Sequence, residues 1–208
     1  MVRAFHDLMT FMGQDAPKLT TIIISRISDM KTKGISPEEF ESSVADFKQK
    51  SIARIYAAYQ QGLMNNNSLD FDDLLCKTVE LFEKCPDVLE YYQNKFKYVL
   101  VDEYQDTNHA QFMLTKLLSE GYDNICVVGD DDQSIYKFRG ATIENILSFE
   151  KNFKNAQVIR LEQNYRSTQN ILDAANAVIS NNEQRKGKNL WTANGKGDKI
   201  VLNTLDDE

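Results

Sequence analysis

The sequence predicts an α/β fold, in which helices flank a parallel sheet, preceded by an all-helical N-terminal subdomain. Short apolar segments at residues 98–101, 125–128 and 158–161 alternate with stretches of helical periodicity. This alternation is typical of a parallel sheet that helices cover on both faces. Residues 1–66 contain no convincing strand, and their apolar residues recur at helical spacing. Two kinds of architecture are therefore expected to follow one another along the chain.

The composition is that of an ordinary globular protein with a sizeable core. The chain has 208 residues, of which 42% are hydrophobic and 26% are charged. No apolar run approaches the ~20 residues that a membrane span needs. The three cysteines have no C-x-x-C spacing, which argues against a disulfide framework or zinc site and for a reducing compartment. We therefore expect a cytoplasmic location and no membrane partner.

The net charge of −7 is unevenly distributed. Most of the acidic excess lies within residues 67–162, whereas residues 1–66 and 163–208 are close to neutral. A negative total gives no support to nucleic-acid binding. A DNA path over the less acidic segments remains compatible with this distribution.

The N-terminal helices are predicted from apolar stripes and from helix-start signals. One stripe runs from Leu19 to Met30 and ends before Gly34. Ser36-Pro37-Glu38-Glu39 is typical of a capping box with proline in the first turn. A second stripe covers residues 52–63, and its tyrosines are more typical of a core than of a base-stacking platform. This subdomain shows no chemistry of its own.

The next helices begin at recognisable signals. Asp70, Asp72 and Asp73 fall in a first helical turn, where the helix dipole favours acids, and we prefer this structural role to a metal site. Pro86 begins a helix that ends near Phe96. Further helices are predicted at 108–119, 142–149 and 168–181, and further strands at 125–128, 158–161 and 200–202. Cys126, inside one of these strands, is expected to lie in the core.

The apolar segment at 98–101 runs without alternation into two adjacent acids, Asp102 and Glu103. Such a segment indicates a strand buried on both faces, and open α/β sheets bind ligands at the carboxyl ends of their strands. An aspartate there can hold Mg²⁺ on a nucleotide phosphate, and the glutamate beside it can deprotonate an attacking water. The alternative is a solvated acidic turn, and this stretch alone leaves both interpretations open.

Two further predicted strands also end in polar loops, at residues 129–140 and 163–167. In a parallel sheet these loops would meet the first one at a single edge. Gln133 would bring an amide that senses a terminal phosphate, and Arg166 a guanidinium whose planar fork suits phosphate oxygens. The local alternative is that Arg166 caps a helix or pairs with Glu162.

Three aromatic residues in these loops are candidate stacking surfaces. Tyr165 offers a flat face for a purine ring, and Tyr136 and Phe138 can stack on the bases of a single strand. The alternative for each is local packing. We prefer the functional interpretation because candidate groups, the acids, the amide and the guanidinium included, recur at three successive strand ends.

The motifs in these loops resemble those of the UvrD/PcrA/Rep group of superfamily 1 DNA helicases, most closely its PcrA-type members. The chain carries VDEYQDTN at 101–108, which is similar to motif II, and VGDDDQSIYKFRGA at 128–141, which is similar to motif III. The chain also carries LEQNYRS at 161–167, which is similar to motif IV. LDFDDL at 69–74 matches the stretch that re-enters the motor domain after its helical insertion. The resemblance covers nearly the whole chain.

The resemblance implies a parallel RecA-like sheet of the P-loop NTPase class and a role for each motif residue. Asp102 would hold Mg²⁺, and Glu103 would be the catalytic base for water. Gln133 would couple the γ-phosphate of ATP to the DNA groove. Tyr165 would stack on adenine, and Arg166 would be the arginine finger.

The resemblance also implies contacts with DNA. Tyr136 and Phe138 would lie near bases of the tracked strand, and Arg139 would link the groove to the nucleotide site. Phe138 stands where close relatives carry tryptophan, so we expect an altered grip rather than its loss. The implied activity is ATP-driven 3′-to-5′ translocation and unwinding, with single-stranded and partly duplex DNA as partners and no protein partner indicated.

The same resemblance divides the chain into a helical insertion (1–66), the C-terminal part of a first RecA-like domain (67–162) and the start of a second (163–208). The P-loop pattern G-x-x-x-x-G-K-[ST] occurs nowhere in the sequence. In this group it would lie upstream of residue 1, and the later motifs downstream of residue 208. We therefore expect an incomplete sheet, no tight binding of ATP or Mg²⁺ by this chain, and no hydrolysis or unwinding by it alone.

Two other interpretations stay open. One is a non-catalytic DNA- or protein-binding module that retains the helicase fold. The Asp102–Glu103 pair and Arg166 weigh against it, because a pure binder needs neither a base nor an arginine finger. The other is a helicase–nuclease subunit whose nuclease domain would follow residue 208. The sequence does not distinguish a role in DNA repair from one in replication.

Overall fold

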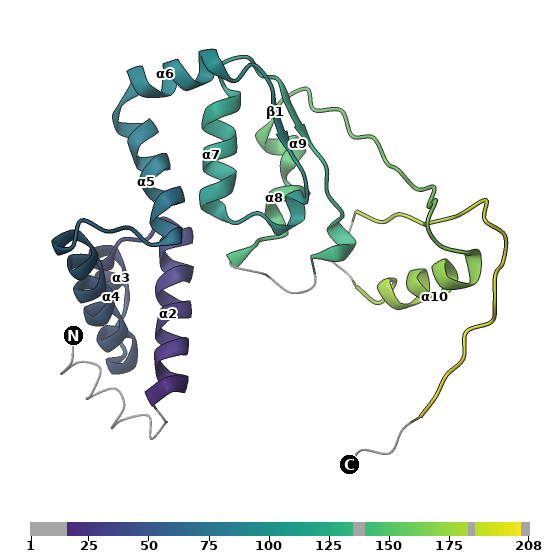
Figure 1. The fold of residues 1–208 in the computed structure, drawn as a ribbon, viewed down its shortest axis with the longest axis horizontal. Coiled ribbons are helices and arrows are strands. Elements are labelled where there is room, and N and C mark those ends of the chain that lie inside the picture. Colours follow the sequence, from purple (N-terminus) through teal and green to yellow (C-terminus); the bar gives the residue numbers. More distant parts are fainter. Residues whose placement is uncertain (1–15, 135–139, 183–185, 205–208) are drawn as a thin grey trace. The chain divides into compact units, whose positions relative to one another are not determined.

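The computed structural model describes residues 16–134, 140–182 and 186–204, which form two compact units (Figure 1). Unit 1 comprises the chain up to Asp130 together with Ser134–Asn145. Unit 2 comprises Asp131–Gln133 and the chain from Ile146 onward. No helix in the described ranges is both long enough and apolar enough to cross a membrane.

The first three helices that the structure describes in unit 1 confirm the helical character predicted for the N-terminal segment. Gly34, at φ +71°, follows the first of them. The predicted capping box at Ser36 is present, because its hydroxyl accepts from the Glu39 N–H and the Glu39 carboxylate accepts from the Ser36 N–H. Both apolar stripes meet in one buried cluster of Leu19, Ile23, Ile27, Ile52, Ile55 and Tyr56. The helices are α2 (Ala16–Thr32), α3 (Pro37–Ser43) and α4 (Phe47–Asn65).

Three more helices pack together in the second half of unit 1. Asp70 caps the first of them reciprocally with Asp73, in the first turn that the sequence predicted. Pro86 begins the second, and Asn108 caps the third with Gln111. Each of these helices contacts the other two, and the first also contacts α2. They are α5 (Phe71–Lys84), α6 (Pro86–Lys95) and α7 (His109–Ser119).

The sheet of unit 1 consists of β1 (Val99–Val101) and β2 (Ile125–Val127), which pair in parallel. Leu100 stands opposite Cys126 in this register, and α7 contacts β1. The predicted parallel pairing is confirmed. The prediction that the strands are buried on both faces is wrong, because Leu100 is 76% exposed and Cys126 is also exposed. Two strands and the helix beside them leave one sheet face uncovered among the described residues.

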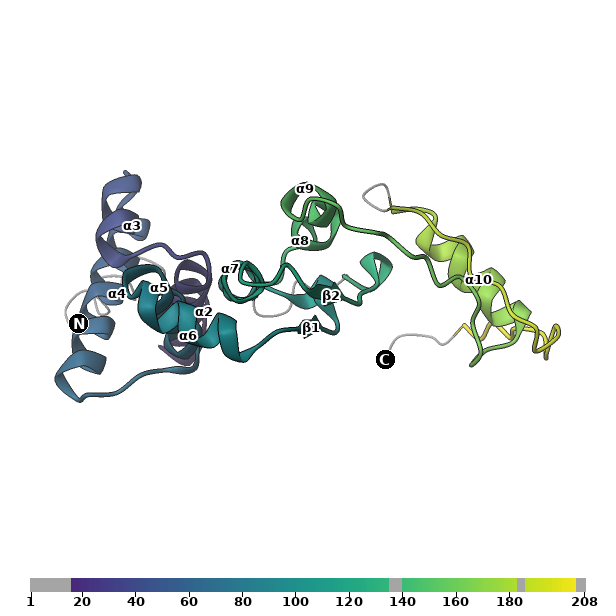
Figure 2. The same ribbon diagram turned by 90° about the horizontal axis from the view of Figure 1, so that it is seen from above.

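Unit 2 is built around α10 (Gln169–Ile179), and Figure 2 shows the chain after residue 186 running alongside it. The Gln169 N–H donates to the Gly195 carbonyl at 2.9 Å, and the Asn176 side chain donates to the Leu190 carbonyl at 3.0 Å. These contacts anchor an irregular segment to a regular helix. The short helices α8 (Glu144–Leu147) and α9 (Phe149–Asn152) precede it, with α8 spanning the junction between the units.

The strands predicted at 158–161 and 200–202 are wrong. Ile159 is 81% exposed and Leu202 is 90% exposed, and neither segment forms a strand. A β-branched sequence favours extended backbone, but a strand also needs a neighbour that supplies its hydrogen bonds. In this region the described residues supply only the isolated bridge between Gln163 and Trp191. The described residues therefore form a mostly helical chain with a small two-stranded parallel sheet, which is consistent with an incomplete α/β fold.

Glu80 on α5 is the centre of a surface ion-pair network whose contribution to the free energy of unfolding can be tested. Hydrogen bonds from Lys77 at 2.6 Å and from Lys84 at 2.5 Å lower the pKa of Glu80 from its ordinary 4.5 to about 2. Because folding lowers this pKa, the stabilisation is complete above pH 4.5 and is lost as the pH falls toward 2. We expect Glu80→Gln to reduce the free energy of unfolding by at most about 0.5 kcal/mol at neutral pH.

Urea unfolding at neutral pH and at low pH measures this effect. The exposed Glu90→Gln variant on α6 is the matched control and should be neutral. A loss that persists undiminished in acid would show that packing of Glu80, rather than its charge, is responsible.

Candidate functional site

Asp102 and Glu103 lie at the carboxyl end of β1, at the turn into the 3-10 helix η1 (Tyr104–Asp106). Both acids are exposed. Glu103 has φ +50° and ψ +42°, a left-handed conformation that is costly for a residue with a side chain. Its N–H donates to Asp102 Oδ1 at 2.9 Å. Their proposed roles stay a prediction.

Two hydrogen bonds tie this turn to the end of β2. The Tyr104 N–H donates to the Val128 carbonyl at 2.9 Å, and the Asp130 N–H donates to Gln105 Oε1, also at 2.9 Å. Gln105 Nε2 donates in turn to Glu103 Oε2 at 2.8 Å. The Tyr104 ring is fully buried, and this burial raises the pKa of its hydroxyl to about 12. Tyr104 and Gln105 are therefore the buried residues that hold the turn carrying the two exposed acids.

A second buried carboxamide holds the chain just after Gln105. Asn145 Nδ2 donates to the Thr107 carbonyl at 3.0 Å and to Thr107 Oγ1 at 3.1 Å. The Thr142 N–H also donates to the Thr107 carbonyl, at 3.1 Å. The described residues before and after 135–139 thus both bond to segment 105–107.

Three predicted DNA-contacting residues, Tyr136, Phe138 and Arg139, lie outside the described residues. Their assignment therefore stays a prediction from the resemblance. Gln133 closes the short 3-10 helix η2 (Asp131–Gln133) in unit 2.

The motif around Arg166 begins with a side-chain turn. Asn164 Oδ1 accepts from the N–H groups of Arg166 and Ser167, at 2.9 and 2.8 Å, just before α10 begins. This is an Asx turn, which a short amide side chain forms with its own backbone. Tyr165 is exposed, and its hydroxyl donates to Gln163 Oε1 at 3.1 Å. Arg166 is exposed too, and no ion pair joins it to Glu162 or to another described residue.

Asp131 and Asp132, which follow β2, share a basic partner within unit 2, because Lys188 Nζ lies 3.9 Å from Asp131 Oδ1 and 3.7 Å from Asp132 Oδ2. Asp131 Oδ2 also accepts from the backbone N–H of Lys186 at 2.7 Å. These interactions make Asp131 and Asp132 weaker metal-ligand candidates than Asp102. Asp102 and Glu103 belong to unit 1, whereas Gln133, Tyr165 and Arg166 belong to unit 2, so their convergence at one site stays a prediction.

The carboxylates at the end of β1 fit a magnesium ion that arrives with a nucleotide. Within the described ranges, no group of three or more His, Cys, Asp and Glu side chains is arranged to hold a metal ion. Magnesium does not need such a group, because it commonly takes one or two carboxylates together with phosphate oxygens and water. Asp102 can supply that carboxylate, and Glu103 beside it can accept a proton from water.

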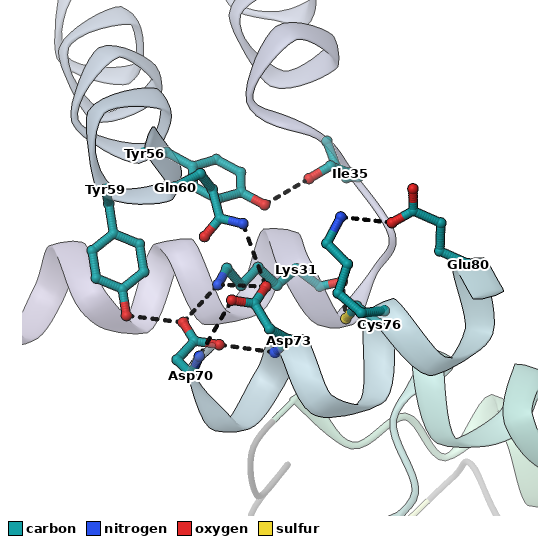
Figure 3. Close-up of polar contacts among 10 residues, drawn as sticks. Lys31, Ile35, Tyr56, Tyr59, Gln60, Asp70, Asp73, Cys76 and Glu80 are labelled. Atoms are coloured by element: carbon teal, nitrogen blue, oxygen red, sulfur yellow. Dashed lines mark hydrogen bonds and ion pairs between the residues drawn. The ribbon is translucent and has the colours of Figure 1, made fainter. Parts of the chain in front are cut away.

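A separate buried ionic cluster joins the N-terminal helices to α5 (Figure 3). Lys31 Nζ lies 2.6 Å from Asp70 Oδ2 and 2.9 Å from Asp73 Oδ1, and the Tyr59 hydroxyl donates to Asp70. Burial, followed by the hydrogen bond to Asp70, raises the pKa of Tyr59 to about 12. Burial also raises the pKa of Cys76, to about 11, and its thiol donates to the Lys31 carbonyl. This cluster supports a structural role for the two aspartates rather than a metal site.

Sequence reasoning missed two residues in these regions. Lys31 lies 39 residues before Asp70, and no local pattern links the two. Gln105 lies inside a motif that drew attention to its acids, but its burial and its bond to Asp130 are visible only in the folded chain.

Two family models match the chain. Residues 3–154 match the UvrD/REP helicase N-terminal domain, and residues 159–208 match the UvrD-like helicase C-terminal domain. The ATP-dependent DNA helicase PcrA of Bacillus subtilis is 56% identical over 186 residues, which cover 89% of this chain and 25% of that protein. PcrA of Staphylococcus epidermidis is 56% identical over 179 residues, which cover 86% of this chain and 25% of that protein. The chain thus spans about a quarter of the length of these relatives.

Proposed function

Because this chain belongs to the UvrD/REP helicase family, we propose that it is part of an ATP-dependent DNA helicase. Such an enzyme couples Mg-ATP hydrolysis to 3′-to-5′ movement on single-stranded DNA and to duplex unwinding. The observation that carries the proposal is the exposed Asp102–Glu103 pair at the end of β1, inside a sequence similar to helicase motif II. PcrA relatives that carry the name ATP-dependent DNA helicase support it.

The proposed nucleotide chemistry assigns one task to each side chain. Asp102 holds Mg²⁺, which neutralises phosphate charge when it is bound. Glu103 orients the attacking water and accepts its proton. Gln133 senses the terminal phosphate, Tyr165 stacks on the adenine ring, and Arg166 neutralises the charge that develops on the transferred phosphoryl group.

The proposed DNA contacts fall between the two anchored ends of the loop after β2. Tyr136 and Phe138 stack on bases of single-stranded DNA, and Arg139 links that groove to the nucleotide site. Phenylalanine at position 138 offers a smaller stacking face than the tryptophan of close relatives, so it alters the grip on the strand. The partners are single-stranded and partly duplex DNA.

The proposed domain organisation follows the same family. Residues 1–66 are the helical insertion, residues 67–162 belong to the first RecA-like domain, and residues 163–208 begin the second. The two family models meet between residues 154 and 159, which supports a junction in this part of the chain.

Stimulation of ATP hydrolysis by single-stranded DNA tests this function. We expect a polypeptide extended in its native reading frame to hydrolyse ATP in the presence of Mg²⁺ and DNA. We expect no hydrolysis by this 208-residue chain alone, because its sequence has no P-loop pattern to cradle the phosphates. Turnover by the 208-residue chain would contradict the second expectation. An extended protein that binds DNA without hydrolysing ATP would favour the non-catalytic binding module.

A further inference from the structure

We propose that Gln105 is a positioning residue, which fixes the carboxylate of Glu103 and ties it to the backbone at the end of β2. The proposal rests on the proposed function, in which Glu103 is the general base. It adds a physical link between that base and Asp130, the residue at which the loop after β2 leaves unit 1.

Gln105 has the two hydrogen-bonding functions that this position requires. Its Oε1 accepts from the Asp130 N–H at 2.9 Å, and its Nε2 donates to Glu103 Oε2 at 2.8 Å. A second, longer bond runs from Nε2 to Asp106 Oδ2 at 3.3 Å. Because a backbone N–H can only donate and a carboxylate can only accept, these partners fix the orientation of the amide. A carboxamide of this length satisfies both at once.

The burial of Gln105 makes this link firm. Gln105 is 1% exposed, whereas the Glu103 side chain that it holds is exposed to solvent. An exposed glutamate samples several rotamers, and a general base is effective only when it stays within hydrogen-bond reach of its water. The left-handed backbone of Glu103 sets the direction in which its side chain leaves the chain, and the hydrogen bond from Gln105 holds its carboxylate. A shift of the backbone at Asp130 therefore changes the placement of the base.

Three variants separate this role from general stability. Gln105→Met keeps the approximate size of the side chain and removes both hydrogen bonds. Gln105→Glu keeps an acceptor for the Asp130 N–H and, as an ionised carboxylate, cannot donate to Glu103. Asn145→Leu is the matched control, because it also replaces a buried carboxamide of unit 1 but touches neither Glu103 nor Asp130.

Amide hydrogen exchange of this 208-residue chain tests the link without any catalysis. We expect the Asp130 N–H to be protected, with protection reduced by at least about tenfold in Gln105→Met and retained in Gln105→Glu and Asn145→Leu. An Asp130 N–H that exchanges freely in the unaltered chain would overturn the link. Equal loss of protection in Asn145→Leu and Gln105→Met would overturn it as well.

Steady-state ATP hydrolysis by the extended polypeptide tests the positioning role. We expect both Gln105 variants to lower kcat by about tenfold or more, with the KM for ATP changed by less than about twofold. Gln93→Met is the control for activity, because the Gln93 side chain donates to the Leu117 carbonyl at 2.7 Å, away from Glu103 and Asp130, and it should retain kcat to within about threefold. If Glu103→Gln is inactive but Gln105→Glu keeps an unchanged kcat, the positioning role of Gln105 is overturned. The assignment of Glu103 as the base then stands. An active Glu103→Gln enzyme would overturn the assignment of the base and this proposal with it.

Discussion

Replacing Lys31 by methionine is expected to lower the free energy of unfolding of this chain by about 3–5 kcal/mol. The Lys31 side chain is 2% exposed and lies within 2.9 Å of carboxylate oxygens of both Asp70 and Asp73. Methionine fills much of the same volume but leaves two carboxylates close together without a cation, inside the contact between α2 and α5. Urea unfolding followed by circular dichroism measures the loss.

Two further variants locate the cause. Lys33→Met removes an exposed ammonium two residues away and should change the free energy of unfolding by less than about 0.5 kcal/mol. Adding Asp73→Asn to Lys31→Met should recover part of the loss, because it removes one of the two unpaired charges. If Lys31→Met costs no more than Lys33→Met, the ionic cluster does not stabilise the contact between these helices.

The free energy of unfolding that Lys31→Met removes should also depend on pH. Burial raises the pKa of Asp70, but hydrogen bonds from Lys31, the Asp73 N–H and Tyr59 outweigh it and hold this pKa below its ordinary value of 3.8. A depressed folded-state pKa means that the stabilisation is complete above pH 3.8 and is lost as the pH falls below it. The difference between the unaltered chain and Lys31→Met should therefore narrow in acid.

The sequence predicts the starts of helices well because their signals are local. Ser36 bonds to Glu39 and Asp70 bonds to Asp73, so each cap is complete within one turn of chain. Pro86 acts at the first turn through its own ring geometry. Such features need no knowledge of the rest of the fold.

Features that depend on distant partners could not be predicted in the same way. The segments at 98–101 and 158–161 each contain two β-branched residues, but only the first has a neighbouring strand within the described residues. Asp102 and Glu103 could be located because acids follow an apolar strand, whereas a resemblance was needed to prefer their catalytic roles to a solvated turn. Gln105 acts through a residue 25 positions later, and sequence spacing does not reveal that contact.

Glu103→Gln is expected to lower the kcat of DNA-stimulated ATP hydrolysis by about 10²–10⁴-fold in the extended polypeptide. The amide has the size of the carboxylate and keeps an oxygen that can accept from Gln105 Nε2, so the turn after β1 should fold unchanged. It cannot take a proton from water, so the loss should fall on kcat, and binding of a fluorescent ATP analogue should persist.

Glu120→Gln, at an exposed position after α7, is the matched control for that variant and should retain full activity. A Glu103→Gln enzyme with a rate within about tenfold of the unaltered protein would place the proton acceptor on another residue. Loss of nucleotide binding together with kcat would instead show that Glu103 contributes to holding the Mg-nucleotide. A selective loss of kcat is the result that a general base at the end of β1 requires, since only the chemical step depends on its proton affinity.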